Sequence, residues 1–275
     1  MRMFEPALRQ LQQGEWSVFG PTSFLRYLHE NDFDSRRVET AAMISVDSID
    51  RLAPELREAG AMVLRLGKAE DGPGTQFALI GTPGRLEDFF LIDETIFTQP
   101  QPEVFQPGLN MRNLLPYYLL PKFTERCMVN LAFASGLIGY ALGLDEPWPT
   151  AAPATGAGTF TFSFLPYPGA KPLQHVAGQV EIDAIFVGRR GGQDTVFVME
   201  SKMGRRGSLA KHKLAYAVWA LISKVGSRPI VPVYLRLRHG NGQVIFDLVE
   251  CQWNGAALTD LTCVRHKHLV VDLPE

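Results

Sequence analysis

Cysteine is scarce in this chain of 275 residues, and its three cysteines, Cys127, Cys251 and Cys263, form no CxxC pair. An odd number of widely spaced cysteines favours a reducing compartment over a disulfide framework, so we expect a cytoplasmic protein. The N-terminus lacks the apolar core of a secretory signal, which predicts no export. Cys251 and Cys263 with His266 and His268 offer zinc-ligand atoms, but their spacing matches no compact zinc module.

Charge is missing from residues 127–144, which read CMVNLAFASGLIGYALGL. Eighteen uncharged residues lie at the lower limit for a helix that spans a bilayer. The stretch stands alone, however, and contains Asn130, Ser135 and three glycines. It therefore predicts one long helix buried between layers of the protein, and no membrane partner.

Two further motifs are absent: the GxSxG of acyl-transfer hydrolases and the phosphate loop of nucleotide-binding proteins. The sequence has no GxSxG, and the GRRGG at residues 188–192 is followed by a predicted strand, without the Lys-Ser/Thr of a phosphate loop. These absences leave hydrolases of the nucleophile-elbow type and P-loop nucleotide binding without a sequence signal.

Acidic residues are absent from residues 201–240, although the whole chain has a formal net charge of −2. This sign bias predicts a local cationic surface that suits a polyanion such as DNA, while a solvated charged face is the ordinary alternative. Its nine basic residues are Lys202, Arg205, Arg206, Lys211, Lys213, Lys224, Arg228, Arg236 and Arg238. Of these, we expect Arg205, Arg206, Lys211 and Lys213 to contact phosphates as a group.

The chain divides into two parts at a proline-rich connector, residues 99–107. Residues 1–106 are expected to form an α/β domain that contacts substrate or a partner, and residues 107–275 a second domain. The fold class is therefore α/β (α+β), with a mixed β-sheet flanked by helices. We expect a helix to begin at Pro121, since proline is tolerated in a first helical turn, and strands to follow at 159–165, 179–187 and 195–202. A helix is then expected at 208–224, followed by strands at 230–236 and 243–251, which the turn Asn241-Gly242 joins. Residues 261–273 are expected to add an edge strand.

Two predicted strands end in polar residues that share a face. In VFVMESK, Glu200 and Lys202 project together because side chains alternate along a strand, and Asp183 and Glu181 do the same in VEIDAIF. If these strands form a hairpin, a carboxylate pair and an ammonium meet at its end. An ordinary surface ion pair and an unrelated turn acid are the alternative interpretation.

Such a group suits phosphodiester hydrolysis, which needs an activated water and neutralisation of charge on the phosphate. Mg²⁺, or Mn²⁺ in its place, binds hard oxygen ligands, so we expect Asp183 and Glu200 to hold the ion, with the Ser201 carbonyl as a further ligand. Lys202 would orient the attacking water or help to deprotonate it, and the sequence does not choose between these roles. Glu181 is more often a solvent-facing acid than a ligand.

This pattern resembles the PD-(D/E)XK nucleases, which include restriction endonucleases: Asp183 is followed after sixteen residues by Glu200-Ser201-Lys202, on two consecutive strands. The resemblance covers residues 121–251 and implies a restriction endonuclease-like core with the order α-β-β-β-α-β. It also implies an acidic residue on the first helix, which makes Glu125 an accessory metal ligand and catalytic residue; a first-turn acid that stabilises its helix would look the same.

The same resemblance implies that the helix after the third strand faces DNA. Lys213 and Tyr216 stand where several branches of the family have Gln and Tyr, and the lysine departs from that pattern. A metal-dependent endonuclease that cuts DNA is the function implied, with a homodimer as a means of cutting both strands. A non-catalytic nucleic-acid-binding protein with the same fold, and a structural domain whose acids are incidental, are the alternatives.

Overall fold

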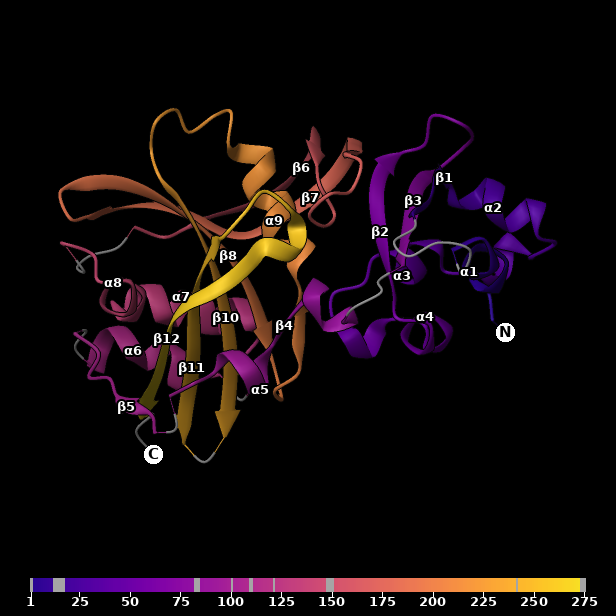
Figure 1. Cartoon of the computed structure of the whole chain (residues 1–275). Helices are drawn as coiled ribbons and strands as arrows, with labels where there is room; N and C mark the ends of the chain where they lie inside the picture. The colour runs from indigo at the N-terminus through magenta and orange to yellow at the C-terminus, as the bar shows by residue number, and fades with distance from the viewer. Residues whose placement is uncertain are drawn as a thin grey trace.

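The computed structural model describes residues 2–11, 18–81, 85–99, 101–108, 111–120, 122–146, 151–240 and 242–272. Over these residues the protein is a mixed α+β structure with a large mixed sheet flanked by helices. Figure 1 shows the N-terminal elements, in indigo and violet, beside a larger body built from the rest of the chain. Pro121 and the turn residue Asn241 lie outside the described residues. The helix expected from Pro121 begins only at Glu125, because residues 122–124 are not helical.

The N-terminal elements are short. Those of the first part of the chain are α1 (Glu5–Leu11), β1 (Val18–Ser23), α2 (Phe24–Glu30), η1 (Ser35–Arg37), α3 (Thr40–Ile44), η2 (Ile49–Arg51), α4 (Pro54–Glu58), β2 (Ala61–Lys68), β3 (Thr75–Gly81), η3 (Leu86–Phe89), β4 (Phe90–Ile92), α5 (Asp93–Ile96) and β5 (Glu103–Val104). Pro54 occupies the first turn of α4, where its missing N–H costs nothing, and this separates η2 from α4.

The remaining elements carry the longer strands. They are α6 (Met111–Tyr118), α7 (Glu125–Ala134), α8 (Leu137–Leu142), β6 (Ala154–Phe164), β7 (Leu173–Arg190), β8 (Gln193–Met203), β9 (Ser208–Ala210), α9 (Lys211–Leu221), β10 (Ile230–Gly240), β11 (Gln243–Trp253), η4 (Leu258–Asp260) and β12 (Leu261–Asp272). The expected strands and the helix that follows the third strand are present, with boundaries that differ by a few residues.

Among the described residues the main sheet has ten strands in the order β1-β3-β2-β7-β8-β10-β11-β12-β5, with β6 also paired to β7. The pairs β6–β7, β7–β8 and β10–β11 are antiparallel, whereas β8–β10 is parallel. A parallel pair needs a crossover, and α9 supplies it. Strands β4 and β9 form a separate two-stranded sheet.

Alternation along the strands divides the core into layers. Met199 of β8 and Leu235 of β10 face one apolar cluster with α7 and α8, while Val198 faces another cluster with α9. The second cluster also contains Phe77 of β3 and Leu64 of β2, so the N-terminal elements share a core with α9.

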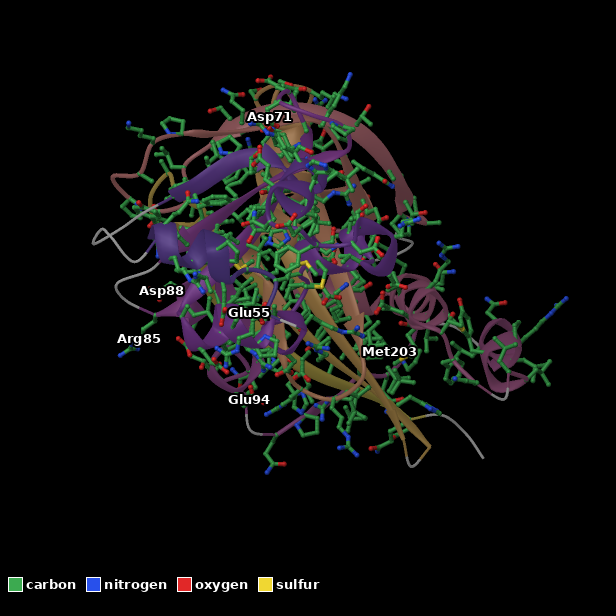
Figure 2. The ribbon with its side chains drawn as sticks, turned by 90° about the vertical axis from the view of Figure 1, so that its right-hand side faces the viewer. Glu55, Asp71, Arg85, Asp88, Glu94 and Met203 are labelled. Carbon is green, nitrogen blue, oxygen red and sulfur yellow. The ribbon has the colours of Figure 1, made fainter. Side chains whose placement is uncertain are left out.

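In Figure 2 the N-terminal side faces the viewer. Asp71 of the β2–β3 turn lies at the top, with Arg85, Asp88, Glu55 and Glu94 below it. Met203, at the end of β8, lies at the right.

The expected single helix over residues 127–144 is wrong: α7 and α8 replace it. Gly136 lies between them with φ 77°, a left-handed conformation that interrupts a right-handed helix. Both helices are buried against the sheet through residues such as Met128 and Leu137. In the described ranges, no helix combines the length and apolar character that crossing a membrane requires.

The N-terminal strands join the larger body through a close backbone approach. Gly67 of β2 pairs with Val176 of β7 at φ 88°, and a Cβ on Gly67 would lie 2.2 Å from the Val176 carbonyl oxygen and 2.8 Å from the Cα of Gly178. Only glycine fits this junction without displacing backbone.

We therefore expect Gly67→Ala to lower the free energy of unfolding by about 3 kcal/mol or more, from backbone strain and the clash together. Urea unfolding of the full chain measures it. Gly226→Ala is the matched control, because Gly226 also has a positive φ of 65°, but a Cβ added there would have no described atom within 4 Å. Equal losses in the two variants would show that the close approach of β2 to β7 contributes nothing.

Candidate functional site

The hairpin of β7 and β8 opens at Asp183. The two strands pair from their turn down to Ala184 opposite Met199, and the pairing of β7 with β6 changes register nearby. Such irregularities re-aim side chains. The Asp183 carboxylate reaches the neighbouring strand, where its Oδ2 accepts the backbone N–H of Ser201 at 2.9 Å. Asp183 thus lies at the end of the ladder, against the Glu200-Ser201-Lys202 segment, as the sequence pattern predicts.

Ser201 connects two carboxylates. Its Oγ lies 3.2 Å from Oδ2 of Asp183 and 3.2 Å from Oε1 of Glu125, and its single proton can be donated to either. Glu125 is the first residue of α7, after the N-cap Thr124, and its Oε2 accepts the backbone N–H of Met203 at 2.8 Å. The predicted metal ligand at Ser201 is its carbonyl oxygen, and this stays a prediction. In the structure the Ser201 N–H and hydroxyl contact Asp183 and Glu125.

Glu200 and Lys202 form an ion pair on the opposite face of β8 from Ser201. Lys202 Nζ lies 2.9 Å from Oε1 of Glu200, whose side chain is 6% exposed. Burial raises the pKa of Glu200, and the negative charge of Asp183 raises it further, while Lys202 and Lys213 act against both. The two carboxylates therefore repel each other, which an added cation would relieve.

The ammonium of Lys202 is held in its charged form. Burial lowers the pKa of Lys202, but the charges of Glu200, Asp183 and Glu125 outweigh burial and leave that pKa above its usual value. Of the two roles that the sequence leaves open for Lys202, a positively charged group that orients and stabilises fits better than a base.

An open cleft lies over one side of this group. Its volume is about 770 Å³, and Glu125, Glu181, Asp183 and Ser201 are among its lining residues. Glu181 is exposed on the rim. Both hydrogen bonds to Asp183 use Oδ2, so Oδ1 has no hydrogen-bond partner within the described ranges. A free carboxylate oxygen beside further carboxylates offers hard oxygen ligands of the kind that Mg²⁺ or Mn²⁺ binds. Glu200 and Lys202 do not line this cleft, and among the described residues Asp183 belongs to no group of three acidic, histidine or cysteine side chains with ligand atoms within 4.8 Å of one another.

The stretch without acidic residues is not one cationic surface in space, which corrects that expectation. Arg236 is buried beside Asp93 at 2.9 Å, and Arg238 lies 2.9 Å from Asp247. Lys211 is also buried, and its Nζ donates to the Thr259 carbonyl at 2.8 Å. These partners come from other segments of the chain. The basic residues that follow one another in the sequence therefore do not form one continuous cationic surface in the folded protein.

Lys211 is consequently removed from the expected phosphate contacts, because its ammonium is committed to a carbonyl inside the protein. Arg205 and Arg206 are exposed after β8, and Arg206 lies over the Phe97 ring with its guanidinium carbon 5.4 Å from the ring centroid. Lys213 is partly buried and acts electrostatically on Glu200. Three of the four expected basic residues thus keep a position from which a phosphate can be contacted.

Tyr216 does not lie on an exposed face of α9, which corrects its predicted position. It is 6% exposed, and its ring packs 5.3 Å from those of Phe162 and Phe164. Tyr216 lines a small cavity with His212 and Arg65, two residues that the sequence does not single out. They come from α9 and β2, far apart in the chain, so no local pattern could have connected them.

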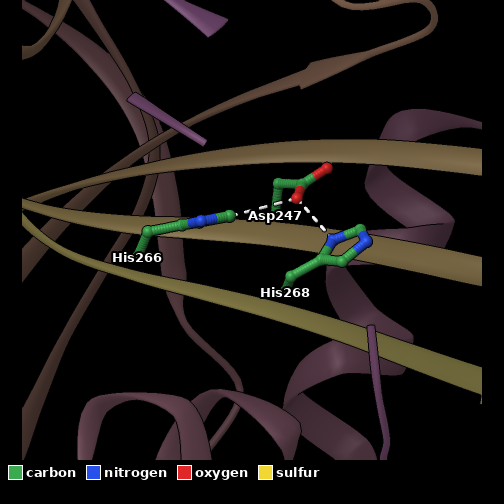
Figure 3. Close-up of side chains that lie close together, drawn as sticks. All are labelled: Asp247, His266 and His268. Carbon is green, nitrogen blue, oxygen red and sulfur yellow. Dashed lines mark hydrogen bonds and ion pairs between the residues drawn. The ribbon is translucent and has the colours of Figure 1, made fainter. Parts of the chain in front are cut away.

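A second polar cluster lies on β11 and β12. Asp247, His266 and His268 have potential ligand atoms within 4.8 Å of one another, and all three are buried (Figure 3). Oδ1 of Asp247 lies 3.1 Å from Nε2 of His266 and 2.6 Å from Nδ1 of His268. His266 and His268 alternate on one strand and so share a face, a signal visible in the sequence. The group consists of these two histidines and Asp247, and it does not include Cys251 or Cys263.

Hydrogen bonds hold His266 and Asp247 in this cluster, whereas Nδ1 of His268, 2.6 Å from Oδ1 of Asp247, makes no hydrogen bond with the residues that the structure describes. The Gln99 backbone N–H donates to Nδ1 of His266, which leaves Nε2–H to donate to Asp247. Arg238 occupies the other carboxylate oxygen. Burial raises the pKa of Asp247, but the His266 hydrogen bond and the His268 and Arg238 charges outweigh it and keep that pKa low. The cluster fastens residue 99 to the sheet.

Comparison with known proteins adds one family. The model of a family described as Domain of unknown function (DUF6997) matches residues 108–270, which include α7, β6 to β11, most of β12 and every predicted site residue. No curated protein and no solved structure matches the chain.

Proposed function

Because the chain belongs to the DUF6997 family, whose description leaves the function open, we propose a function from the site itself: a divalent-metal-dependent nuclease that hydrolyses phosphodiester bonds of DNA. One observation carries the proposal. Asp183 and Glu125 converge on Ser201, while the preceding and following residues, Glu200 and Lys202, form a buried ion pair at the same open end of a hairpin.

The order of elements supports a restriction endonuclease-like core. From Glu125 onward the chain runs α7-α8-β6-β7-β8-β9-α9-β10. Apart from α8 and the short strand β9, which pairs with β4 outside the main sheet, this is the order α-β-β-β-α-β that the resemblance to PD-(D/E)XK nucleases implies. Asp183 lies on the second of these strands and Glu200 and Lys202 on the third. Glu125 begins the first helix, where that resemblance expects an acidic residue.

In the proposed reaction, Asp183 and Glu200 hold the divalent ion, and Glu125 is an accessory ligand. The ion, when bound, supplies Lewis acidity toward the phosphate and lowers the pKa of a bound water. Lys202 stays protonated and places its positive charge beside the phosphate, where negative charge develops. Ser201 keeps two of the carboxylates oriented through its N–H and hydroxyl.

DNA is the proposed partner, and Arg205, Arg206 and Lys213 are the basic residues that would neutralise its phosphates. A homodimer would bring two sites to the two strands of a duplex. The three cysteines are unpaired, which fits a reducing compartment such as the cytoplasm.

The test is cleavage of plasmid and linear DNA by the full chain with Mg²⁺, Mn²⁺ or EDTA. We expect cleavage with either ion and none with EDTA, and a loss of about hundredfold or more in Lys202→Met. Lys68→Met, which removes an exposed lysine at the end of β2, serves as the control for charge and should cut like the wild type.

A wild-type protein that binds DNA with a steep salt dependence but cuts with neither ion would replace the proposal by the non-catalytic alternative. Absence of both DNA affinity and divalent-ion binding would leave a structural domain with incidental acids.

A further inference from the structure

A cavity of about 200 Å³ lies between the N-terminal elements and α9. Its lining residues include Ser45, Arg65 of β2, Gln179 of β7, and His212, Lys213 and Tyr216 of α9. The Arg65 guanidinium donates to Oγ of Ser45 at 3.2 Å. Four segments from distant parts of the sequence therefore meet at one polar hollow, apart from the cleft over Asp183.

Two of the residues that line this cavity carry a buried polar atom without a hydrogen-bond partner among the described residues. Nδ1 of His212 and the hydroxyl of Tyr216 make no hydrogen bond with any residue that the structure describes, although their side chains are only 5% and 6% exposed. An unsatisfied buried polar group costs about 1–3 kcal/mol. The Tyr216 ring is fixed among Phe162 and Phe164, so the hydroxyl cannot turn away. Such atoms indicate a ligand that completes them.

The charge around the cavity has one predominant sign. Arg65 and Lys213 are cationic, and Glu181 is the acid among the lining residues, exposed at the rim. Burial lowers the pKa of His212 to about 3, with Lys213 contributing, and that of His175 to about 4, with Arg65 contributing. Both rings are therefore neutral at pH 7, inside a positive potential.

The hydrogen-bonding groups select the ligand. Arginine and lysine donate and cannot accept, and the Tyr216 hydroxyl, Gln179 amide and His212 ring can also donate. A phosphate group offers acceptor oxygens and negative charge, which match these donors and the cationic Arg65 and Lys213. His175 already uses Nδ1 toward the Phe160 carbonyl and serves as a wall.

The cavity is electrostatically and spatially connected to the candidate nuclease site. Lys213 lines the cavity and also lowers the pKa of Glu200. Glu181 lines both the cavity and the cleft that contains Asp183.

We propose that the cavity between β2 and α9 binds a phosphate group of the nucleic-acid strand, separate from the phosphate that is cleaved, through Arg65, Lys213, His212 and Tyr216. This inference rests on the proposed function for its biological ligand. The phosphate can come from within the strand or from a 5′ end, since both present the same anionic oxygens.

The test uses the full chain in EDTA and follows the His212 ring resonances by NMR during titration with inorganic phosphate. We expect saturable shifts, and affinities about tenfold weaker in Tyr216→Phe and in Arg65→Gln, since each loses a hydrogen bond to an anion. Arg57→Gln, an exposed arginine of α4, controls for charge and should bind like the wild type. Tyr216→Phe should unfold at the same urea concentration as the wild type or higher, because its hydroxyl has no partner to lose.

Oligonucleotides with a 5′-phosphate or a 5′-hydroxyl separate the two sources. An affinity loss in Tyr216→Phe with both identifies an internal phosphate, and a loss only with the 5′-phosphate identifies a strand end. Absence of His212 shifts, or equal phosphate affinity in wild type, Tyr216→Phe and Arg65→Gln, would overturn the proposal. If phosphate binds as expected and no divalent ion supports cleavage, the nuclease function fails while the phosphate site stands.

Discussion

Replacing Asp183 with asparagine is expected to reduce metal-dependent DNA cleavage by about thousandfold, because several kcal/mol of charge stabilisation depend on a bound ion. Asparagine keeps the shape of the side chain and a carbonyl oxygen that can accept the Ser201 N–H. The fold should therefore persist while the negative charge is lost. Initial cleavage rates at saturating Mg²⁺ measure the effect, and DNA affinity in EDTA should not decrease.

Asp145→Asn is a closely matched control. Asp145 also binds backbone N–H groups of the same hairpin, those of Gly191 at 2.9 Å and Gly192 at 2.8 Å, but at its opposite end. A variant that removes this charge should cleave at the wild-type rate. If both variants lost activity equally, support of the hairpin, and not metal binding, would explain the role of Asp183.

Acid is expected to destabilise the protein well before its carboxylates are protonated. Burial lowers the pKa of His175 to about 4 and that of His212 to about 3, while both are about 6.5 in the unfolded chain. Below pH 6.5 the unfolded chain therefore binds more protons, and stability falls as the pH decreases toward the folded pKa values. Each histidine contributes a loss of about 2 kcal/mol between pH 7 and pH 5, a large part of an ordinary folding free energy.

Urea unfolding at pH 7, 6 and 5 measures this loss. His212→Phe, which keeps a buried ring but cannot titrate, should reduce the loss between pH 7 and pH 5 by about 2 kcal/mol. His29→Gln changes an exposed histidine and should leave the pH dependence as in the wild type. An unchanged pH dependence in His212→Phe would contradict a neutral, buried His212.

The local parts of the site were accessible to sequence reasoning because strand geometry alone relates them. Alternation places Glu200 beside Lys202, and the hairpin brings Asp183 to the same end. The first-turn position of Glu125 also follows from its N-cap Thr124. What the sequence could not give was the function of Ser201, because hydrogen bonds from its N–H and hydroxyl depend on how α7 packs on β8.

Long-range partners account for the expectations that the structure corrects. The sequence places Arg236 and Arg238 in the expected cationic surface. In the structure Arg236 forms an ion pair with Asp93 and Arg238 with Asp247, and both acids come from other segments. Lys211 likewise donates a hydrogen bond to the Thr259 carbonyl, which lies in another segment. The break between α7 and α8 depends on the left-handed Gly136, whose conformation a helical hydrophobic pattern does not reveal. The cavity at Tyr216 requires β2 to reach β7, a contact made possible by Gly67.

Manganese binding, followed by electron paramagnetic resonance of the free ion, tests most directly whether Asp183 and Glu200 coordinate the same divalent ion. The account predicts saturable binding to the wild-type chain, competition by Mg²⁺, and loss of that binding in Asp183→Asn and in Glu200→Gln but not in Asp145→Asn. Unchanged Mn²⁺ affinity in the two site variants, with the fold intact by circular dichroism, would contradict it.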